Sequence, residues 1–209
     1  MNKNKNHYAT TNQPKKMFNT VMLCISATLF SASVYSWTPD PEPNPSPEPC
    51  NNDCTQGYDP TTASVEASMG QFPIDSINVP FNVSGFGGGT IYYPSSGTTG
   101  TLGAIAMIPG YLGPESSMAT FGRRMASYGF VVITVATNSI FDQPDSRSTQ
   151  LGYALDQVIN QNNSNSSPIS GMVDPSRLGA MGVSMGGGGT LKLSTGTRLK
   201  AAIPMVPWY

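Results

Sequence analysis

The sequence predicts an α/β fold, a three-layer sandwich with helices on both faces of a mostly parallel sheet. The 209 residues include 22 glycines and 18 prolines, a composition that excludes a helical bundle or a coiled coil. Apolar segments of strand length alternate with segments of helical periodicity. The later apolar segments hardly alternate with polar residues, as is typical of strands that helices bury on both faces.

Residues 1–36 have the features of an export signal. Lysines precede an apolar run at 21–30, and small residues at 31–36 lead to Trp37. The run is shorter than the roughly 20 apolar residues that span a bilayer. We therefore expect a cleaved signal peptide, a secreted mature protein and no stable membrane anchor.

Residues 37–56 are predicted to form a tether with a cysteine pair. Residues 38–49 read TPDPEPNPSPEP, which is typical of an extended, semi-rigid spacer. Cys50 and Cys54 follow, and a local disulfide between them is the first interpretation for an exported protein. Pairing of one of them with a cysteine outside this sequence stays open. A metal site is a weaker interpretation because no histidine or further cysteine accompanies the pair.

Residues 57–209 are predicted to form the folded domain, which contains six strands. Each candidate strand is an apolar, β-branched run bounded by glycine, proline, asparagine or serine. The last four are almost continuously apolar and should be parallel, after an antiparallel beginning. The predicted strands are 76–83, 90–93, 104–109, 131–137, 178–182 and 201–204.

Helices are predicted between these strands at 116–128 and 148–160, where apolar residues recur at helical spacing. A third helix is predicted at 185–195, although four consecutive glycines lie in its first turns. Each glycine disfavours a helix by about 1 kcal/mol relative to alanine. Something other than helix propensity must therefore require these glycines.

The charge pattern argues against a nucleic-acid partner. The chain has 11 basic and 12 acidic residues and a formal net charge of −1, so it offers no basic surface to phosphates. Charged residues make up 11% of the chain, well below the roughly 25% of typical proteins. A nearly neutral surface suits an uncharged substrate.

The segment Gly182-Val183-Ser184-Met185-Gly186 is the candidate catalytic motif. It follows a predicted buried strand and precedes the glycine-rich helix, which is the context of a nucleophile elbow. There the Ser184 hydroxyl would stand at the carboxyl edge of the sheet, and the Met185 N–H would point toward a developing oxyanion. A flexible surface loop is the alternative interpretation. The nucleotide-binding patterns GxGxxG and GxxxxGK[ST] do not occur.

The segment Pro109-Gly110-Tyr111-Leu112-Gly113 supports this interpretation, because it follows another predicted buried strand. In an α/β-hydrolase, the loop at this position supplies the second donor of the oxyanion hole. Tyr111 is placed to give its N–H, and its ring could line the acyl site. An ordinary turn with a core tyrosine is the alternative.

Residues 72–209 resemble the polyesterase–lipase–cutinase family of bacterial α/β-hydrolases, which includes poly(ethylene terephthalate) hydrolases and secreted lipases of cold-adapted bacteria. The matching stretches cover nearly the whole predicted domain, in order. They are Gly89-Thr90-Ile91-Tyr92-Tyr93-Pro94, Ile108-Pro109-Gly110-Tyr111, Gly129-Phe130-Val131-Val132-Ile133-Thr134, Asp142-Gln143-Pro144 with Ser146-Arg147, Gly182-x-Ser184-Met185 with glycines 186–189, and Ala201-Ala202 leading to Pro207-Trp208.

The resemblance implies that Ser184 is the nucleophile and that Tyr111 and Met185 supply the oxyanion hole. It also implies that Tyr111 and Trp208 form an aromatic clamp on the acyl or terephthaloyl group. The substrate would be an ester lipid or polyester, no metal or organic cofactor is called for, and we expect a monomer when the protein is complete. Val183 departs from the family, which usually has tryptophan or histidine there, and the departure affects the shape of the cleft.

Asp142 and Arg147 belong to a DQPxSR segment that recurs in the family. An ion pair or a helix cap that holds this loop is favoured over a role in the chemistry.

The base that Ser184 needs is missing from residues 37–209, because the sole histidine is His7. A serine is activated by an adjacent base that a carboxylate orients. Lys192 and Lys200 lack the proximity that a base requires, and in α/β-hydrolases the acid and the histidine follow the serine along the chain. We therefore expect an incomplete α/β-hydrolase domain at 57–209, without its last strands and helix and without the triad Asp and His.

Two functions stay open at this point. The first is a secreted serine esterase, a triacylglycerol lipase or cutinase-like polyester hydrolase that works through an acyl-enzyme on Ser184, of which the 209-residue chain would be a truncated and inactive form. The second is a non-catalytic module derived from a hydrolase, which would hold lipid or polymer between Tyr111 and Trp208 without cleaving it.

Overall fold

The computed structural model describes residues 61–209, except residues 82 and 84. The predicted signal peptide at 1–36 and the predicted tether at 37–56, with Cys50 and Cys54, lie outside the described residues. The described residues thus belong to the domain predicted at 57–209, from residue 61 onward.

The sheet in this part of the chain has six strands, in the order β1-β2-β4-β3-β5-β6. β1 is antiparallel to β2 and β2 to β4, whereas β4, β3, β5 and β6 are parallel to one another. The predicted antiparallel beginning and the four parallel strands are confirmed. The strands are β1 (Ile74–Val79), β2 (Gly89–Pro94), β3 (Leu102–Ile108), β4 (Phe130–Val135), β5 (Val173–Val183) and β6 (Ala201–Met205).

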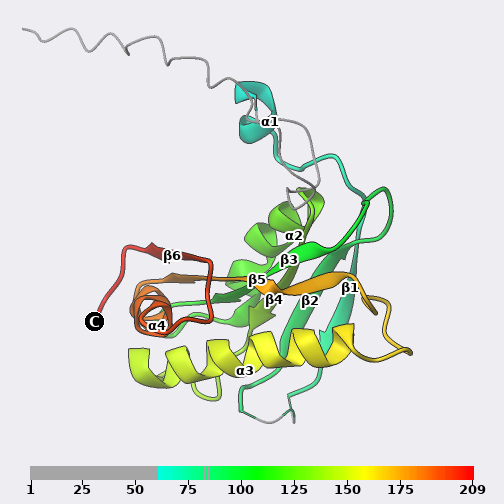
Figure 1. Cartoon of the computed structure of the whole chain (residues 1–209). Helices are drawn as coiled ribbons and strands as arrows, with labels where there is room; N and C mark the ends of the chain where they lie inside the picture. The colour runs from blue at the N-terminus through cyan, green and yellow to red at the C-terminus, as the bar shows by residue number, and fades with distance from the viewer. Residues whose placement is uncertain (1–60, 82, 84) are drawn as a thin grey trace, which may run out of the picture. The chain divides into compact units, whose positions relative to one another are not determined.

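Helices cover both faces of the sheet, so the predicted three-layer sandwich is confirmed (Figure 1). A 3-10 turn (Glu115–Met118) and α2 (Ala119–Ser127) lie on one face, and α3 (Pro144–Asn162) and α4 (Met185–Ser194) lie together on the other. A short helix, α1 (Thr62–Glu66), was not predicted; it buries no residue and so leaves no apolar pattern in the sequence. Within the described residues, no helix is both long and apolar enough to cross a membrane.

The larger of two apolar cores lies between the sheet and α3. Leu151, Leu155 and Val158 recur at helical spacing and are fully buried in one cluster with Ile91 and Ile133 of the sheet. Burial of each such side chain contributes about 1.5–3 kcal/mol. The apolar face predicted for this helix is therefore the face that packs.

Two boundaries differ from the prediction, both at prolines. α3 begins at Pro144 rather than at residue 148, because the fixed φ of proline suits the first position of a helix. β1 ends at Val79 rather than at residue 83, because Pro80 has no N–H with which to continue the strand pairing.

The glycines of α4 allow close packing, which confirms that helix propensity is not what requires them. A Cβ at Gly189 would lie 2.9 Å from the Cβ of Arg147 and 3.0 Å from the backbone nitrogen of Ser148 in α3. A Cβ at Gly188 would lie 2.0 Å from the carbonyl oxygen of Trp208. The backbone of α4 is thus in direct contact with its neighbours.

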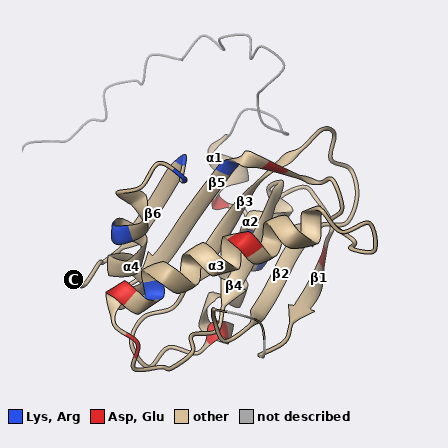
Figure 2. Ribbon diagram, turned by 60° about the horizontal axis from the view of Figure 1, so that its bottom comes forward, with Lys and Arg blue, Asp and Glu red and all other residues tan. Residues whose placement is uncertain are grey.

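Charged residues are few and scattered over the helices, strands and loops of the described part of the chain (Figure 2). Lys192 of α4 pairs with Asp145 of α3, and Arg198 pairs with Asp156 of the same helix. Because these side chains are largely exposed, water screens each pair and the pairs add little to stability. The contact between α3 and α4 therefore depends on the packing of their backbones more than on these charges.

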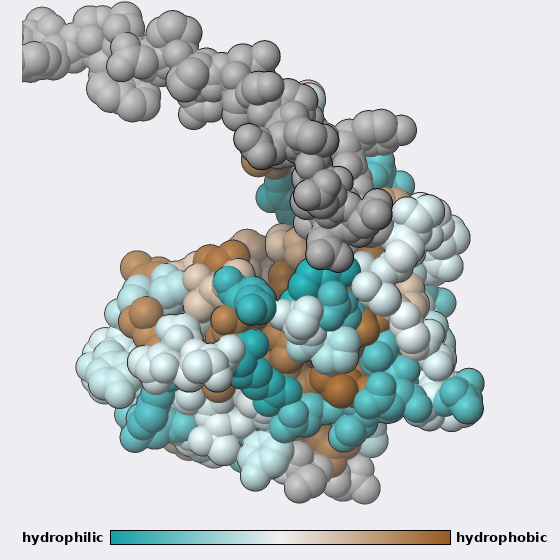
Figure 3. Space-filling model, viewed as in Figure 1, coloured by the Kyte–Doolittle hydropathy of each residue, from teal (hydrophilic) through white to brown (hydrophobic). Residues whose placement is uncertain are grey.

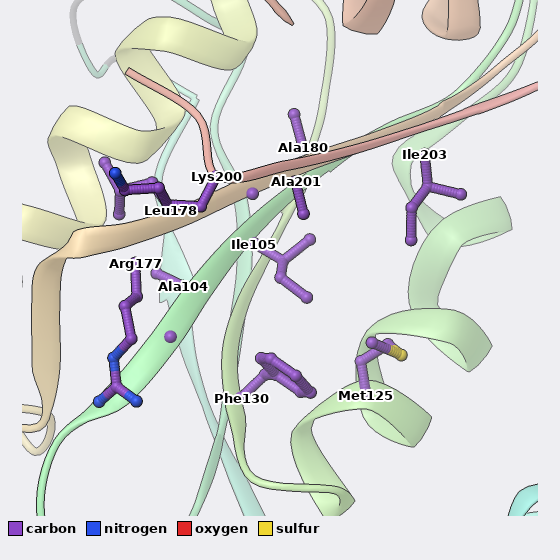
Figure 4. A pocket seen from close by; sticks show the side chains of 12 residues that line it. Ala104, Ile105, Met125, Phe130, Arg177, Leu178, Ala180, Lys200, Ala201 and Ile203 are labelled. Atoms are coloured by element: carbon purple, nitrogen blue, oxygen red, sulfur yellow. The ribbon is translucent and has the colours of Figure 1, made fainter. Parts of the chain in front are cut away.

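An apolar groove of about 300 Å³ opens on the face of the sheet that carries α2. Figure 4 shows Ile105, Phe130 and Met125 in its floor and wall, with Arg177 and Lys200 at one end. On the surface drawn in Figure 3, apolar residues are likewise exposed between polar ones. α2 thus covers only part of this face, and no residue of the serine motif lines the groove.

Replacing Gly189 by alanine should destabilise the protein, although alanine is the better helix former. The added methyl group would overlap α3, and overpacking of this kind costs about 1–3 kcal/mol. Gly152→Ala in α3 is the matched control, because no atom lies within 4 Å of a Cβ at that position. It should stabilise the protein by up to about 1 kcal/mol. Urea unfolding compares the two variants, and an unfolding free energy that Gly189→Ala leaves unchanged would contradict the packing argument.

Candidate active site

Ser184 occupies the turn between β5, which ends at Val183, and α4, which begins at Met185. Its backbone has φ 52° and ψ −118°, a conformation that non-glycine residues rarely adopt and that costs on the order of 1–3 kcal/mol. This is the strand, sharp turn and helix that the motif predicted. The alternative interpretation, a flexible surface loop, is wrong for this segment.

The glycines that flank Ser184 are explained by contacts between backbones. A Cβ at Gly182 would lie 2.2 Å from the carbonyl oxygen of Gly186, and a Cβ at Gly186 would lie 2.5 Å from that of Pro109. Real Cβ atoms do not approach so closely, so side chains at these positions would force β5, α4 and β3 apart. The GxSxG spacing is therefore a packing requirement of this turn.

The Ser184 backbone is fully engaged, whereas its hydroxyl is not. The Ser184 N–H donates to the carbonyl of Met205 (3.0 Å), and the Ser184 carbonyl accepts from the N–H groups of Gly188 (3.0 Å) and Trp208 (2.9 Å). The side chain is half-buried, and among the described residues it has no hydrogen-bond partner for its hydroxyl. The hydroxyl is therefore held in place and left open for a reaction.

The turn after β3 lies beside this hydroxyl. A Cβ at Gly110 would lie 3.1 Å from the Cβ of Ser184 and 3.7 Å from its Oγ. The Gly113 N–H donates to the Gly110 carbonyl (3.0 Å), which closes a four-residue turn with Tyr111 in its second position. The structure thus brings together the two segments that the sequence analysis singled out for the nucleophile and the oxyanion hole.

Aromatic side chains surround the two turns. Tyr111 and Trp208, the residues predicted to clamp the substrate, are 46% and 52% exposed. The main-chain N–H of Trp208 donates to the Ser184 carbonyl. The ring of Tyr111 packs on the ring of Phe141 in an edge-to-face arrangement, with 5.9 Å between centroids. The sequence did not predict a role for Phe141, although this residue directly precedes the DQP segment. Its ring is 58% exposed and adds apolar surface next to Tyr111.

Arg147 holds the DQPxSR loop, as predicted, but through backbone carbonyls rather than an ion pair. Its Nε donates to the carbonyl of Asp142 (2.8 Å). The Asp142 carboxylate instead accepts hydrogen bonds from the Ser139 N–H (2.9 Å) and the Gln150 side-chain amide (2.8 Å). Burial lowers the pKa of the Arg147 guanidinium from its usual value, and the charge of Asp142 acts in the opposite direction.

None of the described titratable residues forms a hydrogen bond with the Ser184 hydroxyl, as a base would. A hydrogen bond to Asp145 raises the pKa of Lys192, so this ammonium group stays protonated near neutral pH. Lys200 lies at the end of the apolar groove (Figure 4). Asp174 is engaged by Arg177 and Ser176. In the described part of the chain, no group of three or more His, Cys, Asp or Glu side chains could hold a metal ion.

Comparison with known proteins gives close matches. A family model described as PETase, PET hydrolase-like, matches residues 49–209. Cutinase 1 of Thermobifida cellulosilytica is 52% identical over 160 residues, which are 76% of this chain and 59% of that protein. A cutinase of Thermobifida fusca is 52% identical over 160 residues, covering 76% and 52% of the two chains. Bis(hydroxyethyl) terephthalate hydrolase of Streptomyces coelicolor is 47% identical over 160 residues, covering 76% and 50%.

The chain spans between 50% and 59% of the length of these relatives. The mixed sheet with helices on both faces agrees with these matches, and the resemblance stated from the sequence is confirmed. This chain belongs to the PET hydrolase-like family of polyesterases and cutinases within the α/β-hydrolases.

Proposed function

We propose that this protein is a secreted serine esterase of the cutinase or polyester hydrolase type, with Ser184 as its nucleophile. The observation that carries the proposal is the Ser184 turn, whose strained backbone presents an unengaged hydroxyl beside the turn of Tyr111. The relatives named cutinase and bis(hydroxyethyl) terephthalate hydrolase support an ester as the substrate.

In the proposed reaction, the Ser184 oxygen attacks the carbonyl carbon of the ester and loses its proton to a base. The N–H groups of Tyr111 and Met185 donate hydrogen bonds to the resulting oxyanion. The tetrahedral intermediate then collapses, and the alcohol leaves with the proton from the base. In the second half of the reaction, water attacks the acyl-enzyme by the same steps and releases the acid from Ser184. No step calls for a metal or an organic cofactor.

We propose that the base and its carboxylate partner belong to a longer form of the protein. The only histidine in the sequence is His7, in the predicted signal peptide, and the matched region covers 59% and 52% of the two Thermobifida relatives. In α/β-hydrolases the acid and the histidine come after the serine in the chain. A segment encoded after Tyr209 would supply both.

The surface around Ser184 suits a bulky, uncharged ester. The exposed rings of Tyr111, Phe141 and Trp208 offer apolar contacts to an acyl or aromatic group. The low proportion of charged residues in the chain agrees with an uncharged substrate. Polyesters and lipid esters both fit this description, and the names of the relatives favour polyesters.

Ser184→Ala should abolish ester hydrolysis. The test uses an extended chain, in which the C-terminal part of the Thermobifida cellulosilytica cutinase continues this chain after Tyr209. Loss of the nucleophile should lower kcat/KM for p-nitrophenyl butyrate by at least about a thousandfold. Ser166→Ala, in an exposed loop, is the control and should leave the rate unchanged. An extended chain that folds and hydrolyses equally well without Ser184 would exclude the proposed nucleophile.

The 209-residue chain should show no more than residual turnover, since oxyanion stabilisation can act without a base but activates Ser184 poorly. Robust hydrolysis by this chain that depends on Ser184 would contradict the account of the base. We also expect the gene to encode, after the Tyr209 codon and in some frame, an aspartate followed by a histidine. Unrelated nucleotide sequence there, together with saturable binding of an ester polymer by the chain, would favour the non-catalytic binding module instead.

A further inference from the structure

Arg147 is a buried cation whose guanidinium donates hydrogen bonds only to backbone carbonyls. Its side chain is 0% exposed and is among the largest fully buried side chains in the described residues. Besides the bond from Nε to Asp142, Nη1 donates to the carbonyl of Pro109 (2.9 Å) and Nη2 to that of Ile140 (3.1 Å). The guanidinium therefore joins three segments: α3, the end of β3, and the loop at 139–143.

Stability alone does not explain a charge at this position. None of the three ion pairs among the described residues includes Arg147. A cation removed from water and held by neutral carbonyls recovers only part of its lost hydration, so burying this charge is costly. The geometry that the guanidinium imposes on its partners is a better explanation.

Two of those partners lie on either side of the turn that carries Tyr111. The Pro109 carbonyl belongs to the peptide that leads into Gly110, whose Cα lies beside Ser184. The Ile140 carbonyl accepts the N–H of Leu112 (2.9 Å) as well as Nη2 of Arg147. Arg147 thus holds the turn directly at its start and through Ile140 near its end, with Tyr111 between.

The turn needs such support because its backbone is strained. Leu112 has φ 58°, in the left-handed region that leucine rarely adopts. Conformations of this kind persist only where surrounding contacts hold them. The Leu112 N–H bond to Ile140 is such a contact, and the Ile140 carbonyl is in turn oriented by Arg147.

The same side chain also contacts α4, the helix that begins directly after Ser184. A Cβ at Gly189 would lie 2.9 Å from the Cβ of Arg147, so α4 packs directly on this residue. Arg147 therefore contacts both of the elements that carry the proposed oxyanion donors, the turn of Tyr111 and the helix of Met185.

We propose that Arg147 is a positioning residue for the oxyanion hole. Through the Pro109 and Ile140 carbonyls, Arg147 fixes the Tyr111 N–H relative to Ser184. The inference rests on the proposed function only in naming the Tyr111 N–H as an oxyanion donor. The mechanical part, a turn held by Arg147, does not depend on catalysis and can be measured in the 209-residue chain.

The first experiment measures amide hydrogen exchange by NMR in the 209-residue chain and its Arg147→Met and Arg147→Lys variants. Loss of the guanidinium should accelerate exchange of the Leu112 amide at least about tenfold. The amides of Ala106 and Ala180, in the buried centres of β3 and β5, should change less than about threefold. Arg147→Lys should give an intermediate effect, because an ammonium group lacks the planar fork that reaches several carbonyls.

Arg198→Met is the matched control, because it removes a guanidinium that also binds a carbonyl of α3, that of Gly152, but lies away from the turn. It should leave the Leu112 amide unchanged. Equal acceleration at Leu112, Ala106 and Ala180 would mean that Arg147 only stabilises the fold, and no acceleration at Leu112 would also overturn the proposal. If Arg147→Met does not fold, Arg147→Lys is judged by the same three amides.

The second experiment measures kcat and KM for p-nitrophenyl butyrate in the extended chain. Misplacing an oxyanion donor weakens an interaction made mainly in the transition state, so Arg147→Lys should lower kcat about tenfold or more with little change in KM. A change in KM alone would overturn the link to the oxyanion hole. If Ser184→Ala leaves hydrolysis intact, the proposed function fails, while the exchange of the Leu112 amide still decides whether Arg147 holds the turn.

Discussion

The close approach of three backbones around Ser184 is the constraint on which the rest of the site depends. β5, the first turn of α4 and the end of β3 meet at Gly182, Gly186 and Pro109, with no side chain between them. Only this approach allows the turn of Ser184 to lie beside the turn of Gly110. The glycine-rich composition of this region is thus a consequence of where the reactive hydroxyl must stand, and it is maintained at the expense of helix propensity.

Both turns hold strained residues, and the surrounding structure supplies the restraint. Ser184 and Leu112 have positive φ although neither is glycine. Ser184 is anchored by backbone bonds to Met205, Gly188 and Trp208, and Leu112 by its bond to Ile140. The core between the sheet and α3 offsets the cost of this strain, since it buries continuous apolar strands and a full helix face. The buried core therefore stabilises a fold that holds two strained turns at the carboxyl edge of its sheet.

The sequence was sufficient to predict the strands and the elbow, because both leave local patterns. Strands buried on both faces are apolar along their length, and this pattern predicted β3, β4, β5 and β6 and their parallel arrangement. The expected burial holds for β3, β4 and the second half of β5 but is wrong for β6, whose residues are exposed or half-buried. The spacing of Gly182, Ser184 and Gly186 between a strand and a helix predicted the sharp turn. Local proline effects shifted the start of α3 and the end of β1, and α1 was missed because a helix that buries no residue has no apolar periodicity.

By itself, then, the sequence determined the order of elements, the family resemblance and the identity of the candidate nucleophile. Only the tertiary structure decided what Arg147 binds, which loop the ring of Phe141 joins, and how near Gly110 lies to Ser184. The physical reason is distance along the chain. Arg147 meets Pro109, and Gly110 meets Ser184, across dozens of residues, and no local pattern encodes which carbonyl a buried guanidinium will reach once the sheet and helices have packed.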